Sequence, residues 1–348
     1  MSYVVRLNGR GNAWPIELGA PQGPGSRHTA LAGDFREYAN TSFSIIREDA
    51  HGNQEWSVLI DVGMGIVDAL VRGGNRLPDA VVITHPHFDH VAGLDWLVAS
   101  HSRHGVRPKL PVYATERCWA DIMTRFSWLA AGTELCVLPL GHAVRVSTAS
   151  GLQLKALPVF HGDYAPGASM ILTELQEAES SFRVLFTGDL LCPLLRRSDV
   201  EELRAVVAVF ADCNTRFPWP RSNHWSIVVE EYRKVLETWD RYGKLEALRR
   251  PHAGDPSEEQ YFSGVDPEST QLFWAVDEFV EAIAAKNVCV VHYSGYEDAK
   301  HHGRDILSDE ELVTWIRGGG ARAGSVEWHI PRPGQLCSIG TDGRLTWR

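Results

Sequence analysis

A short cluster of histidine and aspartate residues follows an apolar segment in the first third of the chain. The apolar segment is 80–83, and the residues after it include, in order, His85, His87, Asp89 and His90. In an extended chain, residues two positions apart point to the same side, so His85 and His87 converge on one point. Asp89 and His90 fall where the chain turns into a helix expected over 91–103, which directs them toward a second point nearby. Imidazole nitrogen and carboxylate oxygen are suitable ligands for zinc, with iron or manganese as alternatives. The sequence therefore predicts a site for two metal ions.

Three further candidate ligands stand at the ends of strand-like apolar segments. His161 follows 154–160, Asp189 follows 182–186, and His292 follows 288–291. Open sheets place their functional sites at the carboxyl ends of strands. A catalytic metal needs about three protein ligands and an open position for water. These three residues are therefore expected to complete the metal site.

The set and order of these residues resemble those of the metallo-β-lactamase superfamily. The matching residues are Asp61, His85, His87, Asp89, His90, His161, Asp189 and His292. The resemblance implies an α/β fold, a four-layer αβ/βα sandwich with two zinc ions at its seam. It also implies that the first metal is held by His85, His87 and His161, and the second by Asp89, His90 and His292. Asp189 would then bridge the two metals, and Asp61 would orient ligands from behind.

Composition and charge argue against several classes of protein. The 348 residues are expected to form a single domain, 1–348, with a helical insertion at about 218–286, before His292. The net charge of −10 argues against a broad polyanion-binding surface, so long nucleic acid is not expected as a partner. The six cysteines have no paired spacing, which argues against a disulfide framework. No apolar run reaches membrane length, and we expect a cytoplasmic protein without a membrane partner.

A second pair of chemically informative residues lies between Asp189 and His292. Asp212 follows the apolar segment 206–210, and His224 precedes a helix expected over 227–240. A carboxylate beside a histidine can fix the imidazole's tautomer and raise its pKa, so that it can protonate a leaving oxygen. The two short motifs around them, Asp212-Cys213-Asn214 and His224-Trp225-Ser226, resemble those of the phosphodiesterase branch of the superfamily. That branch contains tRNA 3′-processing endonucleases and cyclic-phosphodiester hydrolases, and in this chain Trp225 interrupts the usual His-Ser/Thr pair.

These observations predict a metal-dependent hydrolase in which a metal-activated water attacks a small phosphodiester or short nucleotide. Asp89, Asp212 and His224 are the expected catalytic residues. Two alternatives keep the metal site: an acyl-bond hydrolase (a thioesterase or lactonase), or a non-catalytic, metal-stabilised subunit that binds a partner. The Asp212 and His224 pair favours phosphodiesters, because acyl-bond hydrolysis does not require it. A homodimer is compatible with the resemblance.

Overall fold

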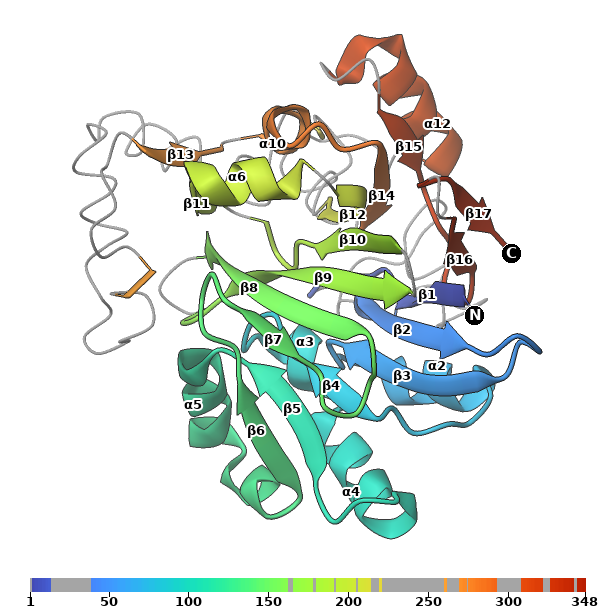
Figure 1. Ribbon diagram of the computed structural model, residues 1–348, viewed down its shortest axis with the longest axis vertical. Helices are drawn as coiled ribbons and strands as arrows, with labels where there is room; N and C mark the ends of the chain where they lie inside the picture. Colours follow the sequence, from blue (N-terminus) through green and yellow to red (C-terminus); the bar gives the residue numbers. More distant parts are fainter. Residues whose placement is uncertain are drawn as a thin grey trace, which may run out of the picture.

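The computed structural model describes residues 2–13, 39–161, 165–177, 180–190, 192–204, 206–213, 219–220, 260–261, 269–273, 275–292, 308–321, 326–340 and 343–348. Two large β-sheets face each other in this part of the chain, with helices on their outer faces (Figure 1). The predicted α/β sandwich is therefore confirmed. None of the described helices is long and apolar enough to cross a membrane.

The first sheet contains strands from both ends of the chain. Its described strands are, in spatial order, β17 (Leu345–Trp347), β16 (Leu336–Ile339), β1 (Ser2–Gly9), β2 (Ser42–Glu48), β3 (Gln54–Ile60), β4 (Ala80–Val82), β5 (Leu110–Ala114) and β6 (Thr133–Val137). Strands β3 to β6 are parallel, and their carboxyl ends therefore lie at one edge of the sheet.

The second sheet is built from the part of the chain between β6 and β16. Its described strands are, in spatial order, β13 (Thr270–Leu272), β11 (Cys192–Arg196), β8 (Leu152–Phe160), β9 (Ser169–Glu177), β10 (Ser180–Phe186), β12 (Val206–Asp212), β14 (Asn287–Val291) and β15 (Glu327–His329), and β7 (Ala143–Arg145) pairs with β8. Strands β10, β12, β14 and β15 run parallel, so the residues after β10, β12 and β14 emerge at the same edge.

Helices cover the outer faces of the two sheets. The described helices are α2 (Ile66–Arg72), α3 (Phe88–Val91), α4 (Leu94–His104), α5 (Glu116–Arg125), the 3₁₀ helix η2 (Ser127–Ala131), α6 (Arg197–Leu203), α10 (Val276–Ala282), α12 (Asp309–Trp315) and the π-helical segment η4 (Ile316–Gly320). Helices α2, α4 and α5 pack on the first sheet, and α6, α10 and α12 on the second.

Strand periodicity explains why the core has three parts. On β4, Val82 contributes to the core between the sheets, whereas Val81 contributes to the core under α2, α4 and α5. On β12, Phe210 contributes to the core between the sheets, whereas Val209 contributes to the core under α6, α10 and α12. Because alternate side chains point to opposite faces, strands that are apolar at every position are buried on both sides. The described part of the molecule therefore has four layers, in the order helices, first sheet, second sheet, helices.

The predicted helix over 91–103 is divided in the structure. The chain forms α3, which contains Asp89 and His90, and then α4. At Gly93 the backbone lies so close to the segment before α2 that an added Cβ would stand 3.0 Å from the Val62 and Gly63 carbonyl oxygens. Helical periodicity does not report such a close approach, so the prediction missed the break before α4 and the separate short helix α3.

Most of the predicted insertion at 218–286 lies outside the described residues. Its described residues include Trp219, Tyr261, β13 and α10, all attached to the second sheet or its helices. The boundaries of the insertion, and the single-domain organisation of 1–348, remain predictions.

Candidate metal centre

All seven candidate ligands lie in segments that follow strands. His85 and His87 follow β4, Asp89 and His90 lie in the short helix α3, and His161 directly follows β8. Asp189 and His292 follow β10 and β14 of the second sheet. Six of the seven are buried to at least 95%, and His87 is half-buried. Strands of both sheets therefore deliver these side chains to one edge of the sandwich.

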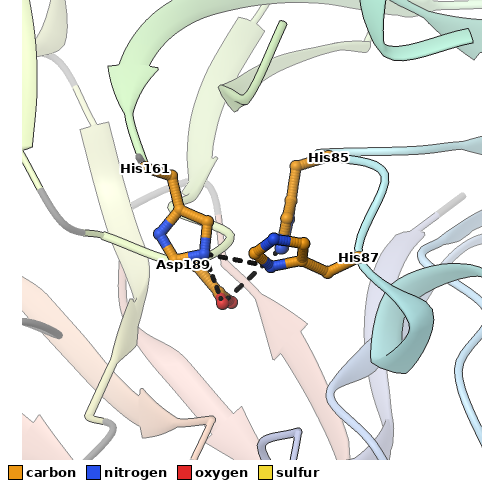
Figure 2. Close-up of side chains that lie close together, drawn as sticks. All are labelled: His85, His87, His161 and Asp189. Atoms are coloured by element: carbon orange, nitrogen blue, oxygen red, sulfur yellow. Dashed lines mark hydrogen bonds and ion pairs between the residues drawn. The ribbon is translucent and has the colours of Figure 1, made fainter. Parts of the chain in front are cut away.

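A first group is formed by His85, His87, His161 and Asp189, whose side chains point toward one another in Figure 2. One ligand atom from each lies within 4.8 Å of the others. His161 Nε2 is 3.2 Å from His87 Nδ1 and 3.2 Å from Asp189 Oδ2. His85 Nε2 is 3.5 Å from the same carboxylate oxygen.

A second group is formed by Asp89, His90, Asp189 and His292, again with ligand atoms within 4.8 Å of one another. His90 Nε2 is 3.1 Å, and His292 Nε2 3.0 Å, from Asp189 Oδ1. Asp89 Oδ2 is 3.2 Å from His90 Nε2 and 3.5 Å from His292 Nε2. The two oxygens of Asp189 therefore face different groups, with Oδ2 directed to the first and Oδ1 to the second.

Asp61 supports the second group from behind. Its Oδ2 is 2.8 Å from His90 Nδ1 and accepts a hydrogen bond from the Thr84 hydroxyl at 2.7 Å. Its Oδ1 accepts the Thr84 backbone N–H at 2.8 Å. A carboxylate on Nδ1 keeps the proton on that nitrogen and leaves Nε2, the atom facing the group, as a lone-pair donor.

Asp212 makes the corresponding contact with His292. Its Oδ1 is 2.8 Å from His292 Nδ1, and its Oδ2 accepts the Leu190 backbone N–H at 2.9 Å. The sequence analysis named His292 as a metal ligand but paired Asp212 with His224, which lies outside the described residues, and did not predict the contact between Asp212 and His292. The parallel pairing of β12 with β14 sets Asp212 opposite Val291, the residue before His292, and this pairing is not visible in the sequence.

Burial and neighbouring charges shift the pKa values of the histidines in different directions in the two groups. Burial and neighbouring histidines lower the pKa of His85 well below its usual value and that of His87 to about 4. Burial also opposes the charged forms of His90 and His292, but the surrounding carboxylates outweigh it and raise both pKa values. The same histidines outweigh burial at Asp89 and lower the pKa of its carboxyl.

The surroundings of two buried ring nitrogens are better explained by metal binding than by hydrogen bonding. Within the described part of the chain, His85 Nε2 and His90 Nε2 have no hydrogen-bond partner of acceptable geometry, although both are buried. Buried polar atoms normally have a hydrogen-bond partner. A cation bound between these two nitrogens and the carboxylates that they face would supply the missing partner. Their nitrogen and oxygen donors are those that bind zinc and related divalent ions. The residues present therefore fit divalent metal binding.

The loop that carries His85 and His87 has supports that the sequence did not reveal. The Arg125 guanidinium, at the end of α5, donates to the Pro86 carbonyl oxygen between the two histidines. The backbone N–H of Ser169, on β9, donates to the Thr84 carbonyl oxygen at 2.9 Å. Both contacts join residues far apart in the chain, and no local pattern marks them.

Comparison with known proteins agrees with this site. A family model described as the beta-lactamase superfamily domain matches residues 57–244, more than half of the chain. The match includes Asp61, the cluster from His85 to His90, His161 and Asp189. The chain belongs to the metallo-β-lactamase superfamily. Together with the His/Asp groups, this membership indicates a metal-dependent hydrolase that binds divalent metal.

Solved structures of the same superfamily share the fold across nearly the whole chain. A diphosphatase from the PhnP family has a TM-score of 0.55 at 15% identity, covering 96% of this chain and 96% of its own. YhfI from Bacillus subtilis, a metallo-beta-lactamase fold protein, has a TM-score of 0.54 at 13% identity, covering 97% of this chain and 100% of its own.

One curated relative matches part of the sequence. The uncharacterized protein sll0514 from Synechocystis sp. is 28% identical over 134 residues, which are 38% of this chain. The matched stretch spans 22% of that relative's length.

Proposed function

We propose that the protein is a binuclear zinc phosphodiesterase that acts on a small phosphodiester or a short nucleotide. The observation that carries the two-metal part is Asp189, whose two oxygens face two separate groups of ligands. Phosphorus chemistry is supported by the diphosphatase with the same fold. Manganese or iron would suit the same donors. A homodimer and a cytoplasmic location stay predictions.

The proposed ligand sets follow the two groups. His85, His87 and His161 would hold one ion, and Asp89, His90 and His292 the other, with Asp189 shared. Two such ions would supply a water of lowered pKa and an electrostatic clamp on the phosphoryl oxygens. Behind them, Asp61 and Asp212 would fix His90 and His292 in the orientation that presents Nε2. Asp89 would orient the attacking water as well as bind metal.

Proton delivery to the leaving oxygen is proposed for His224, with Asp212 as its orienting carboxylate. Each carboxylate oxygen has more than one lone pair, so the contact of Asp212 with His292 leaves capacity for a second imidazole. Asp212 would then serve both metal binding and proton transfer.

The first experiment measures hydrolysis of bis(p-nitrophenyl) phosphate by protein of known metal content, beside thioester and lactone substrates. We expect phosphodiester turnover with about two ions per chain. Asp189→Ala should lose both ions and all turnover, whereas His161→Ala should lose mainly one ion. Acyl-bond turnover without phosphodiester turnover would replace the proposal by a thioesterase or lactonase. If the metal-loaded protein hydrolyses none of these substrates, the result would favour a non-catalytic subunit that binds a partner.

A second experiment separates the two proposed roles of Asp212. His224→Ala should lose far more activity on a dialkyl phosphodiester, which has a poor leaving group, than on p-nitrophenyl esters, and should keep its metal. Asp212→Asn should in addition weaken metal binding, because it changes the hydrogen bond to His292. Equal losses by His224→Ala on good and poor leaving groups would remove the proton-donor role.

A further inference from the structure

A buried threonine hydroxyl lies between Asp61 and a ligand of the first group. Thr84 is 1% exposed and stands directly before His85 in the chain. Its Oγ1 is 2.7 Å from Asp61 Oδ2 and 3.1 Å from His85 Nδ1. Asp61 therefore reaches the second ligand group directly, through His90, and is connected to the first group through this hydroxyl.

The direction of these hydrogen bonds follows from the donors and acceptors present. A hydroxyl has one proton to donate and two lone pairs, and a carboxylate can only accept. The Thr84 proton therefore goes to Asp61, at the shorter of the two distances. The hydroxyl can then only accept from His85 Nδ1, which must carry the proton of the ring. His85 Nε2, 3.5 Å from Asp189 Oδ2, is left with a lone pair facing the first group.

His90 does not need this relay. Its Nδ1 is 2.8 Å from Asp61 Oδ2 but 3.5 Å from the Thr84 hydroxyl, so its proton goes to the carboxylate. Asp61 Oδ2 thus accepts from both Thr84 and His90, within the capacity of one carboxylate oxygen. Loss of the hydroxyl would remove the link to His85 and leave the contact with His90 in place.

The Thr84 side chain is fixed by its surroundings. Its backbone N–H donates to Asp61 Oδ1 at 2.8 Å, and its carbonyl oxygen accepts from the Ser169 N–H at 2.9 Å. A Cβ added at Gly188, the residue before Asp189, would stand 3.0 Å from Thr84 Cβ. The loop that carries Asp189 therefore packs against this side chain and helps to hold its hydroxyl between Asp61 and His85.

We propose that the Thr84 hydroxyl is a positioning group that extends the orienting action of Asp61 to His85, so that one carboxylate aligns a ligand in each group. Hydrogen bonds to the remote nitrogen of a ligating imidazole fix its tautomer and ring orientation. Here one such bond is direct, at His90, and the other passes through a hydroxyl, at His85. This inference rests on the two ligand sets of the proposed function, and it does not depend on the substrate.

The test measures zinc affinity in chains that keep one complete ligand group. His292→Ala removes a ligand of the second group, and His161→Ala removes one of the first. Thr84→Val replaces the hydroxyl by a methyl group of similar size. In the His292→Ala chain it should lower zinc affinity about 10- to 100-fold, in a chelator-buffered titration. In the His161→Ala chain the loss should be smaller, because His90 keeps its contact with Asp61.

Two further variants separate positioning from a general effect on packing. Thr84→Ser keeps the hydroxyl and should retain the zinc affinity of Thr84 in both chains. Thr173→Val, the control, removes another buried hydroxyl, which donates to the Val184 carbonyl oxygen, and should leave zinc affinity unchanged. Equal losses by Thr84→Val in the two chains, or losses in Thr84→Ser as large as in Thr84→Val, would overturn the proposal.

A second route gives an answer if Thr84→Val does not fold. Asp61→Asn in the His292→Ala chain should lower the zinc affinity of the first group, because the orienting carboxylate behind Thr84 is lost. Unchanged affinity there would overturn the relay. Zinc affinities as expected without any phosphodiester turnover would support the role of Thr84 and overturn the proposed substrate. Wild-type protein that binds no zinc would overturn both.

Discussion

At the scale of single residues, two aspartates make equivalent contacts with two histidines of the second ligand group. Asp61 and Asp212 each lie 2.8 Å from the Nδ1 of a histidine whose Nε2 faces Asp189. Asp61 and His292 also have positive φ angles of 55° and 57°. Residues other than glycine adopt that region at a cost of about 1–3 kcal/mol, which persists where surrounding contacts require it. The hydrogen bonds to Thr84 and between Asp212 and His292 are such contacts.

The role of Asp61 predicts a specific defect. Asp61→Asn removes the charge and one of the two accepting oxygens that serve Thr84 and His90, so His90 loses its fixed orientation. Metal affinity should fall about 10- to 100-fold while the protein stays folded. The check is zinc binding in a chelator-buffered titration, with Asp68→Asn on the exposed face of α2 as the matched control. Unchanged affinity in Asp61→Asn would refute the orienting role.

At the scale of elements, the loop after β3 packs closely against the ligand helix α3 and the residues that follow it. The backbone N–H of Val62 donates to the His90 carbonyl oxygen, and Gly93 donates to the Val62 carbonyl oxygen. A Cβ added at Gly63 would stand 1.7 Å from the Asp89 carbonyl oxygen and 2.5 Å from Asn40 Cβ. The loop after β3 and the helix α3 therefore fit together only because position 63 has no side chain.

Gly63→Ala should accordingly disturb both stability and metal binding. Overpacking in such a place costs about 1–3 kcal/mol, and the displaced backbone belongs to the ligand Asp89. Thermal unfolding and metal content measure the two effects. Gly318→Ala is the control, because an added Cβ there meets nothing within 4 Å and the residue has no positive φ. Equal behaviour of the two variants would contradict the close-packing argument.

At the scale of the whole molecule, a buried carboxylate joins four separate parts of the chain. Asp199 on α6 accepts from Lys155 Nζ on β8 at 2.8 Å, from Arg196 Nε on β11 at 2.7 Å, and from the Tyr261 hydroxyl at 2.6 Å. Burial alone would raise the pKa of this carboxyl, but these donors outweigh it and lower the pKa. The network ties Tyr261, within the predicted insertion, to the strands that lead to and from the metal centre.

Removal of this carboxylate should destabilise the fold. Asp199→Ala leaves Arg196 and the Tyr261 hydroxyl without this partner and leaves Lys155 with Glu202 alone. Breaking a buried ion pair costs about 3–5 kcal/mol. Glu201→Ala, two residues away on α6, removes an exposed pair with Arg204 and should cost at most about 1 kcal/mol. Urea unfolding of the two variants measures the difference. Similar losses would show that the buried network contributes little.

The sequence by itself determined the ligand types and the strand ends on which they stand. His85, Asp189 and His292 each follow an apolar strand, and strand periodicity and apolar runs are local properties that a chain displays along its length. Parallel strands bring their carboxyl ends to one edge, so a metal site built from these residues was predictable together with the α/β fold.

Only the tertiary structure decided which atoms meet. Asp89 and His292 are 203 residues apart, and their contact depends on how the two sheets face each other. The division of the Asp189 oxygens between two groups and the contact of Asp212 with His292 have the same origin. Such contacts depend on the packing of whole layers, and no periodicity within a single segment encodes them.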